Sequence, residues 1–169
     1  AEDGKRVAIE IDHKAVHRED GGDLEVGEWS PIVRATLHFN PILRLSVLLR
    51  LQVQSAEPLS IFLKPLNLDP KAPPPQARLS MPRDFSIELA AKLDFETLGW
   101  ACVTNALNDQ AIDDEAFLGD IERVLAQREA LLLDRLARDD WHLLYEVFGE
   151  TDRVQHLMLR YADEQHPLY

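Results

Sequence analysis

The chain has 169 residues, enough for one domain with a hydrophobic core, and its 46% hydrophobic and 28% charged residues exclude a disordered chain. No apolar run reaches the roughly 18 residues that a membrane-spanning helix needs, so we expect no membrane span. The formal net charge of -12 argues against binding to the phosphate backbone of nucleic acids, which requires a surface rich in Lys and Arg.

Residues 1–68 predict an antiparallel, β-rich region. Strands are expected at residues 5–12, 32–39, 43–54 and 59–63. In the second of these, Val33, Ala35, Leu37 and Phe39 alternate with polar residues, and residues 43–54 alternate in the same way. Such alternation is typical of strands with one face on a core and one polar face. We therefore expect a small antiparallel sheet or sandwich.

Residues 69–83 predict a connection between the β-rich region and a helical second half. Three successive prolines, Pro73 to Pro75, cannot lie in the interior of a sheet, because proline lacks the backbone N–H that a ladder requires. A stiff spacer explains this run better than a recognition motif.

Residues 84–169 predict a mainly helical region. A short helix follows Asp84 as its cap, and a long helix runs from a cap at Asp113 or Asp114 to about residue 137. Residues 141–148 are apolar and predict a buried strand, and residues 152–161 predict a last helix with Thr151 as its cap. One buried strand cannot form a sheet, so the other strands would come from elsewhere. The absence of an initiating Met at Ala1 also favours an internal piece of a larger protein.

Asp152 and His156 are the candidate metal ligands. Residues four apart share one face of a helix, so the carboxylate and the imidazole could reach one ion. The spacing alone favours a surface pair, or a capping Asp beside a helical His, over a metal site. A metal site needs at least a third protein ligand, and no spacing rule ties His166 to the pair. Cys102 is the single cysteine, which excludes a cysteine zinc site.

Several motifs, taken together and in order, resemble one family. They are residues 27–30 (Gly-Glu-Trp-Ser), 69–70 (Asp-Pro), 97–100 (Thr-Leu-Gly-Trp), 128–129 (Arg-Glu), 148–156 (Phe-Gly-Glu-Thr-Asp-Arg-Val-Gln-His), 161–163 (Tyr-Ala-Asp) and 166–169 (His-Pro-Leu-Tyr). The chain, over almost its whole length, resembles predicted bacterial phosphohydrolases of the type I phosphodiesterase/nucleotide pyrophosphatase branch of the alkaline phosphatase superfamily.

The resemblance implies an α+β fold: an antiparallel β-rich insertion or cap, followed by helices and one strand of an incomplete α/β core. It also implies two zinc-type ions about 4 Å apart. Asp152 and His156 would hold one ion together with a later His. The second ion would take an early Asp, a nucleophilic Thr or Ser and a later Asp-His pair. The chain matches none of these other ligands, so the nucleophile is expected upstream and the isolated chain is expected to be inactive.

The resemblance implies a phosphate-ester substrate, whose identity as a nucleotide, a phosphodiester lipid or a phosphonate stays open. Two alternatives also stay open. The chain could be a non-catalytic binding module with a β-rich domain, in which Asp152 and His156 are incidental. It could also be a relative that keeps the fold without metal or chemistry. The sequence gives neither the oligomeric state nor the compartment, cytoplasmic or periplasmic.

Overall fold

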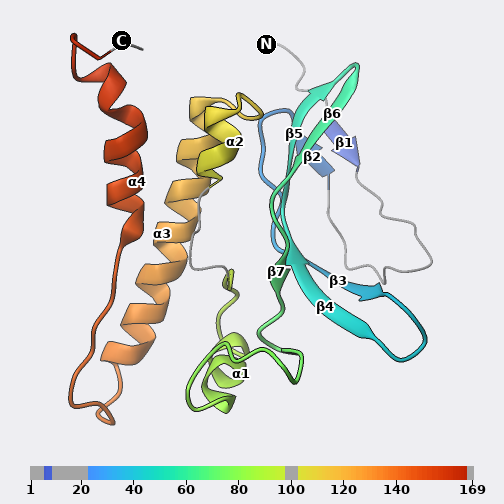
Figure 1. Ribbon diagram of the computed structural model, residues 1–169, viewed down its shortest axis with the longest axis vertical. Coiled ribbons are helices and arrows are strands. Elements are labelled where there is room, and N and C mark those ends of the chain that lie inside the picture. The colour runs from blue at the N-terminus through green and yellow to red at the C-terminus, as the bar shows by residue number, and fades with distance from the viewer. Residues whose placement is uncertain (1–5, 9–22, 98–102, 167–169) are drawn as a thin grey trace. The chain divides into compact units, whose positions relative to one another are not determined.

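The computed structural model describes residues 6–8, 23–97 and 103–166, and the chain divides into two units, Ala1–Gly99 and Trp100–Tyr169 (Figure 1). In the first unit the elements are β1 (Arg6–Ala8), β2 (Asp23–Glu25), β3 (Val33–His38), β4 (Arg44–Leu49), β5 (Leu51–Ala56), β6 (Leu59–Leu63), β7 (Asn67–Leu68) and α1 (Asp84–Ala90). In the second they are α2 (Thr104–Asn108), α3 (Asp114–Leu136), α4 (Gly149–Met158) and the 3-10 turn η1 (Leu159–Tyr161). The predicted α+β class, with antiparallel strands first and helices after them, is confirmed.

The strands of the first unit pair in three antiparallel groups: β1 with β2, β3 with β4 and β7, and β5 with β6. In the largest group Val33 pairs with Leu49 and Leu37 with Leu45. Side chains of directly paired residues lie on the same face of a sheet, so these pairings gather the apolar positions of β3 and β4 on one side. The alternation read from the sequence therefore sets the register.

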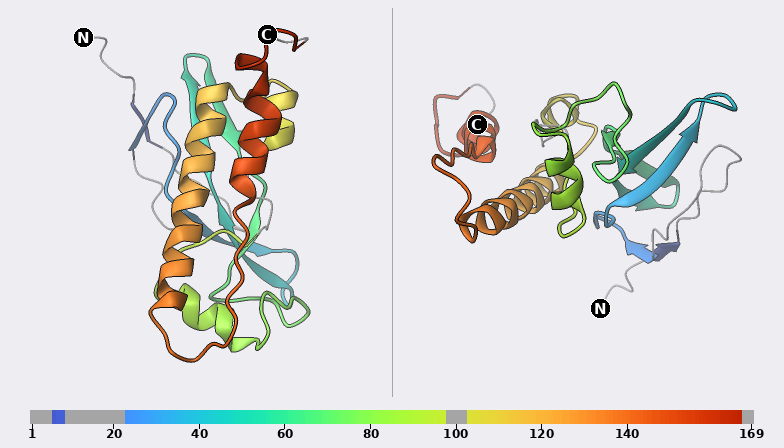
Figure 2. Two further views of the ribbon diagram at one scale, coloured as in Figure 1. Left: turned by 90° about the vertical axis from the view of Figure 1, so that its left-hand side faces the viewer. Right: turned by 90° about the horizontal axis from the view of Figure 1, so that it is seen from below.

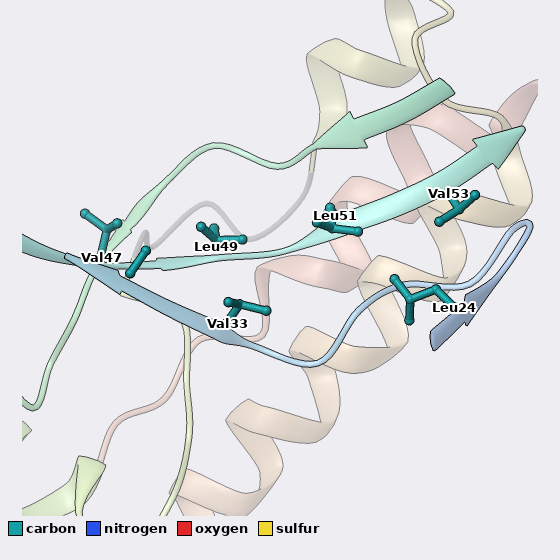
Figure 3. Close-up of a cluster of buried hydrophobic side chains, with 7 residues drawn as sticks. Leu24, Val33, Val47, Leu49, Leu51 and Val53 are labelled. Carbon is teal, nitrogen blue, oxygen red and sulfur yellow. The ribbon is translucent and has the colours of Figure 1, made fainter. Parts of the chain in front are cut away.

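One hydrophobic cluster forms the centre of the first unit (Figure 3). Its buried members come from β2, β3, β4 and β5, and they are Leu24, Val33, Ala35, Val47, Leu49, Leu51 and Val53. All but Leu24 were predicted to face one side of their strands. Phe39 was predicted to join them, and this was wrong: β3 ends at His38, and Phe39 is exposed in the turn after it.

The predicted strand over residues 43–54 is two strands. β4 ends at Leu49 and β5 begins at Leu51, and the two belong to different sheets. The face predicted to be polar carries Arg50 and Gln52, and both are buried. Burial is possible because each finds a partner: Gln52 donates to the backbone carbonyl of Gly27 at 3.0 Å, and Arg50 pairs with Glu96.

Glu96 lies between two buried cations of the first unit. Lys64 Nζ is 2.6 Å from Glu96 Oε2, and Arg50 Nη1 is 3.5 Å from Glu96 Oε1. The three side chains are each at most 8% exposed. Removing charges from water is costly, and a carboxylate between the two cations offsets that cost. This cluster connects β5 and β6 to the segment after α1.

Asp94, two residues before Glu96, ion-pairs with Arg34 and, at 3.4 Å, with Lys71. Partial burial raises the pKa of Asp94, but hydrogen bonds and charge from Arg34 and Lys71 outweigh it, so the pKa is lowered overall. Because the pKa is lower in the folded protein, the ionised Asp94 stabilises the fold at pH values above 3.8, and this stabilisation is lost as the pH falls below that value.

We expect Asp94→Asn to reduce stability at neutral pH by less than about 1 kcal/mol, since the side chain is half exposed. Urea titrations should show that the difference in unfolding free energy between the variant and wild type shrinks below pH 3.8. A difference that does not change with pH would contradict the ion pairs.

Residues 69–83 contain no helix or strand, and all of them are described. Arg83 donates to the carbonyl oxygens of Pro73, Pro74 and Pro75 at 3.4, 3.1 and 3.0 Å, so the proline run folds back toward the start of α1. The prediction of Asp84 as a helix cap was wrong. Asp84 is the first residue of α1, and the hydroxyl of Ser80 accepts from the first-turn amide of Ser86 at 2.9 Å.

The long helix α3 is capped by Asp113, one of the two caps that the sequence predicted. Asp113 accepts a hydrogen bond from the amide of Ala116 at 2.8 Å, which satisfies one of the free donors of the first turn. Phe117, Ile121 and Val124 are buried at helical spacing, as predicted. Among the described residues, no helix has the length and apolarity to cross a membrane.

The predicted buried strand over residues 141–148 is absent. The segment is described throughout and contains no strand; Leu143 and Tyr145 are 85% and 81% exposed. Apolar alternation produces a strand only where a neighbouring strand offers hydrogen bonds, and the described part of the second unit contains none. α4 begins earlier than predicted, at Gly149. Thr151 is therefore inside the helix rather than its cap, and its hydroxyl donates to the carbonyl of Phe148 at 3.1 Å.

Candidate functional site

Asp152 and His156 lie together on α4. His156 Nε2 is 3.4 Å from Asp152 Oδ1, and the side chains are 76% and 63% exposed, respectively. The prediction that both residues share one helical face is confirmed by this distance. Their solvent-facing position leaves room for an ion and for further ligands.

The donor types of this pair suit a zinc-type ion, which takes imidazole nitrogen and carboxylate oxygen. The pair supplies two donors, whereas zinc sites require at least three protein ligands. No group of three or more His, Cys, Asp or Glu residues able to hold a metal occurs among the described residues. Among the described residues, the pair therefore has two donors and no third. His166, whose amide donates to the carbonyl of Asp163, adds no ligand to it.

The start of α4 is held by Arg128 of α3. Arg128 Nε donates to Glu150 Oε1 at 2.6 Å, and its Nη1 donates to Glu146 Oε1 and to the carbonyl of Val147, both at 3.3 Å. The sequence carried no signal for the contact, because 22 positions separate Arg128 from Glu150.

The far end of α4 is held by Asp114, in the first turn of α3. Asp114 pairs with Arg160 and accepts a hydrogen bond from the hydroxyl of Tyr161, both in η1. α3 and α4 lie side by side (Figure 2). The helix that carries the candidate ligands is thus tied to α3 near both of its ends, while Asp152 and His156 point away into solvent.

The other residues singled out in the sequence have structural partners or fall outside the described residues. Trp29 packs edge-on against Phe62 with ring centres 6.0 Å apart, and Ser30 Oγ accepts from the amide of Leu51. Thr97 donates to the carbonyl of Leu68 at 2.8 Å. The hydroxyl of Ser80 bonds to backbone groups, which gives it no base to activate it. Some of the motif residues and other candidates lie outside the described residues. They are Leu98, Gly99, Trp100, Cys102, His13, His17 and the segment 167–169.

His142 was predicted to be a structural histidine in a buried strand. It is instead exposed in the segment before α4. His38 ends β3 and is half-buried, consistent with a polar-face residue of that strand. Neither lies in a group of potential metal ligands among the described residues.

No family model matches the chain, and no curated protein or solved structure shows significant similarity to it. The resemblance to the alkaline phosphatase superfamily thus rests on the order and content of the motifs. The geometry of the pair on α4 is compatible with that resemblance.

Proposed function

We propose that the chain is part of a metal-dependent phosphohydrolase of the alkaline phosphatase superfamily, in which Asp152 and His156 hold one of two zinc-type ions. The observation that carries this proposal is the Asp152–His156 pair, 3.4 Å apart and open to solvent on α4. The motif around the pair and the motifs upstream of it support the same assignment.

In such an enzyme the bound ion polarises a phosphoryl oxygen and lowers the pKa of the attacking water. This chain's contribution is two donors, the Asp152 carboxylate and the imidazole of His156. A zinc-binding histidine is neutral, so His156 would hold the ion through an unprotonated ring nitrogen. The nucleophilic Thr or Ser and the remaining ligands belong to other parts of the parent protein.

The test is hydrolysis of bis(p-nitrophenyl) phosphate by the parent protein with added zinc. We expect Asp152→Asn to lower kcat at least about 100-fold, because the amide is a poor zinc ligand and an ion's contribution is several kcal/mol. Asp139→Asn, which changes an exposed carboxylate outside α4, should leave kcat within about twofold, since Asp139 is not one of the proposed ligands. Full activity in Asp152→Asn would overturn the ligand assignment.

A non-catalytic interaction module is the second candidate. Its supporting observation is the number of large apolar side chains that are exposed in both units, among them Ile42, Leu143 and Tyr145. Exposed apolar groups of this kind mark interfaces when they gather in one area. A folded, zinc-loaded parent without any phosphoesterase activity would favour this candidate, or a relative that has lost the chemistry.

A further inference from the structure

Beyond the ligands, α4 carries a buried carboxylate whose role the proposed function does not explain. Glu150 is 3% exposed, although it lies one residue into a helix whose next polar residues, Thr151 and Asp152, are exposed. Its Oε1 accepts from Arg128, and its Oε2 is buried with no hydrogen-bond partner among the described residues. A buried carboxylate with one unsatisfied oxygen depends strongly on the cation that faces it.

The guanidinium of Arg128 makes three contacts with the segment that leads into α4. It reaches the side chains of Glu146 and Glu150 and the backbone carbonyl of Val147. Arginine can do this because its planar group presents several N–H donors at fixed angles, whereas a lysine ammonium acts as a single point charge. These contacts fix the path of the chain just before the helix and the position of the first helical turn.

We infer that Arg128 is a positioning residue for the Asp152–His156 pair, acting through Glu150. Asp152 is two residues after Glu150, in the same helical turn, and His156 comes one turn later. A helix rises by only about 1.5 Å per residue, so holding its first turn holds both candidate ligands. The inference deepens the proposed function and rests on it for the identity of the ligand, a divalent cation.

The test uses the parent protein, which on the proposed function supplies the remaining ligands, and cobalt as the probe, with binding followed by NMR of the His156 ring. We expect Arg128→Lys to raise the Kd for cobalt about 10-fold, as loss of groups that orient metal ligands commonly does. The matched control is Arg135→Lys in the same helix. Arg135 pairs with exposed Asp140, which lies before α4, so the Kd of this variant should stay within about twofold of wild type. Equal affinities in Arg128→Lys and wild type would overturn the inference.

A second readout does not require metal. Hydrogen exchange of the α4 amides should accelerate about 10-fold or more in Arg128→Lys, since charge-assisted hydrogen bonds that hold the helix are weakened. Exchange in Arg135→Lys should match wild type over α4. If α4 exchanges equally in all three proteins, Arg128 does not position the helix, whatever the result with cobalt.

The two readouts separate the inference from the proposed function. Cobalt binding that is equal in wild type and Asp152→Asn would contradict the ligand assignment. In that case, accelerated exchange in Arg128→Lys would still support the conclusion that Arg128 fixes the position of α4. Binding that depends on Asp152 but not on Arg128 would support the ligands and reject the positioning role. Weaker cobalt binding and faster α4 exchange, both specific to Arg128→Lys, would support the two together.

Discussion

Glu96→Gln is expected to destabilise the first unit by about 3 kcal/mol, because it removes the carboxylate charge that pairs with two buried cations. Glutamine keeps the shape of the side chain and one acceptor oxygen, so the loss of stability reports mainly the removal of the negative charge. Arg50 and Lys64 would each lose the carboxylate charge with which they pair, at sites that are almost fully buried.

The measurement is urea unfolding followed by the NMR signal of the Trp29 indole. Trp29 is buried against Phe62, so its signal reports the first unit. The matched control is Asp94→Asn, two residues away and half exposed, for which the expected loss is below about 1 kcal/mol. Equal losses in the two variants would mean that burial does not strengthen the Glu96 cluster, against the geometry described.

The inward faces of β3 and β4 could be predicted because they depend on local pattern. Val33, Ala35, Val47 and Leu49 alternate with other residues, and a period of two admits only one assignment of faces. The burial of Arg50 could not be predicted. Its partner Glu96 lies 46 positions away, and no local rule connects the two.

The same distinction holds for the candidate site. Asp152 and His156 were placed on one face because the spacing of four is a property of every α-helix. Arg128 was missed because its partners are brought near by the packing of α3 against α4. The segment 141–148 was misassigned for a related reason: its apolar pattern describes what its side chains favour, while strand formation also needs a partner for its backbone.

Phe117→Ala is expected to destabilise the second unit by about 4 kcal/mol, the upper part of the range for truncating a buried aromatic side chain. Phe117 is the largest side chain with no exposed surface in the first turns of α3, so its removal creates a cavity that neighbours cannot fill by simple rotation. Thermal unfolding followed by helical circular dichroism reports this change, because α3 is the longest of the described helices.

Leu118→Ala is the control for that measurement, since it removes an apolar side chain at the next position of the same helix. Leu118 is 37% exposed, and the expected loss is about 1 kcal/mol, in proportion to the smaller area withdrawn from water. Similar losses in the two variants would show that α3 is not anchored by the face that carries Phe117. Because Asp114 and Arg128 hold α4 from this helix, a loosened α3 should also weaken cobalt binding at Asp152 and His156.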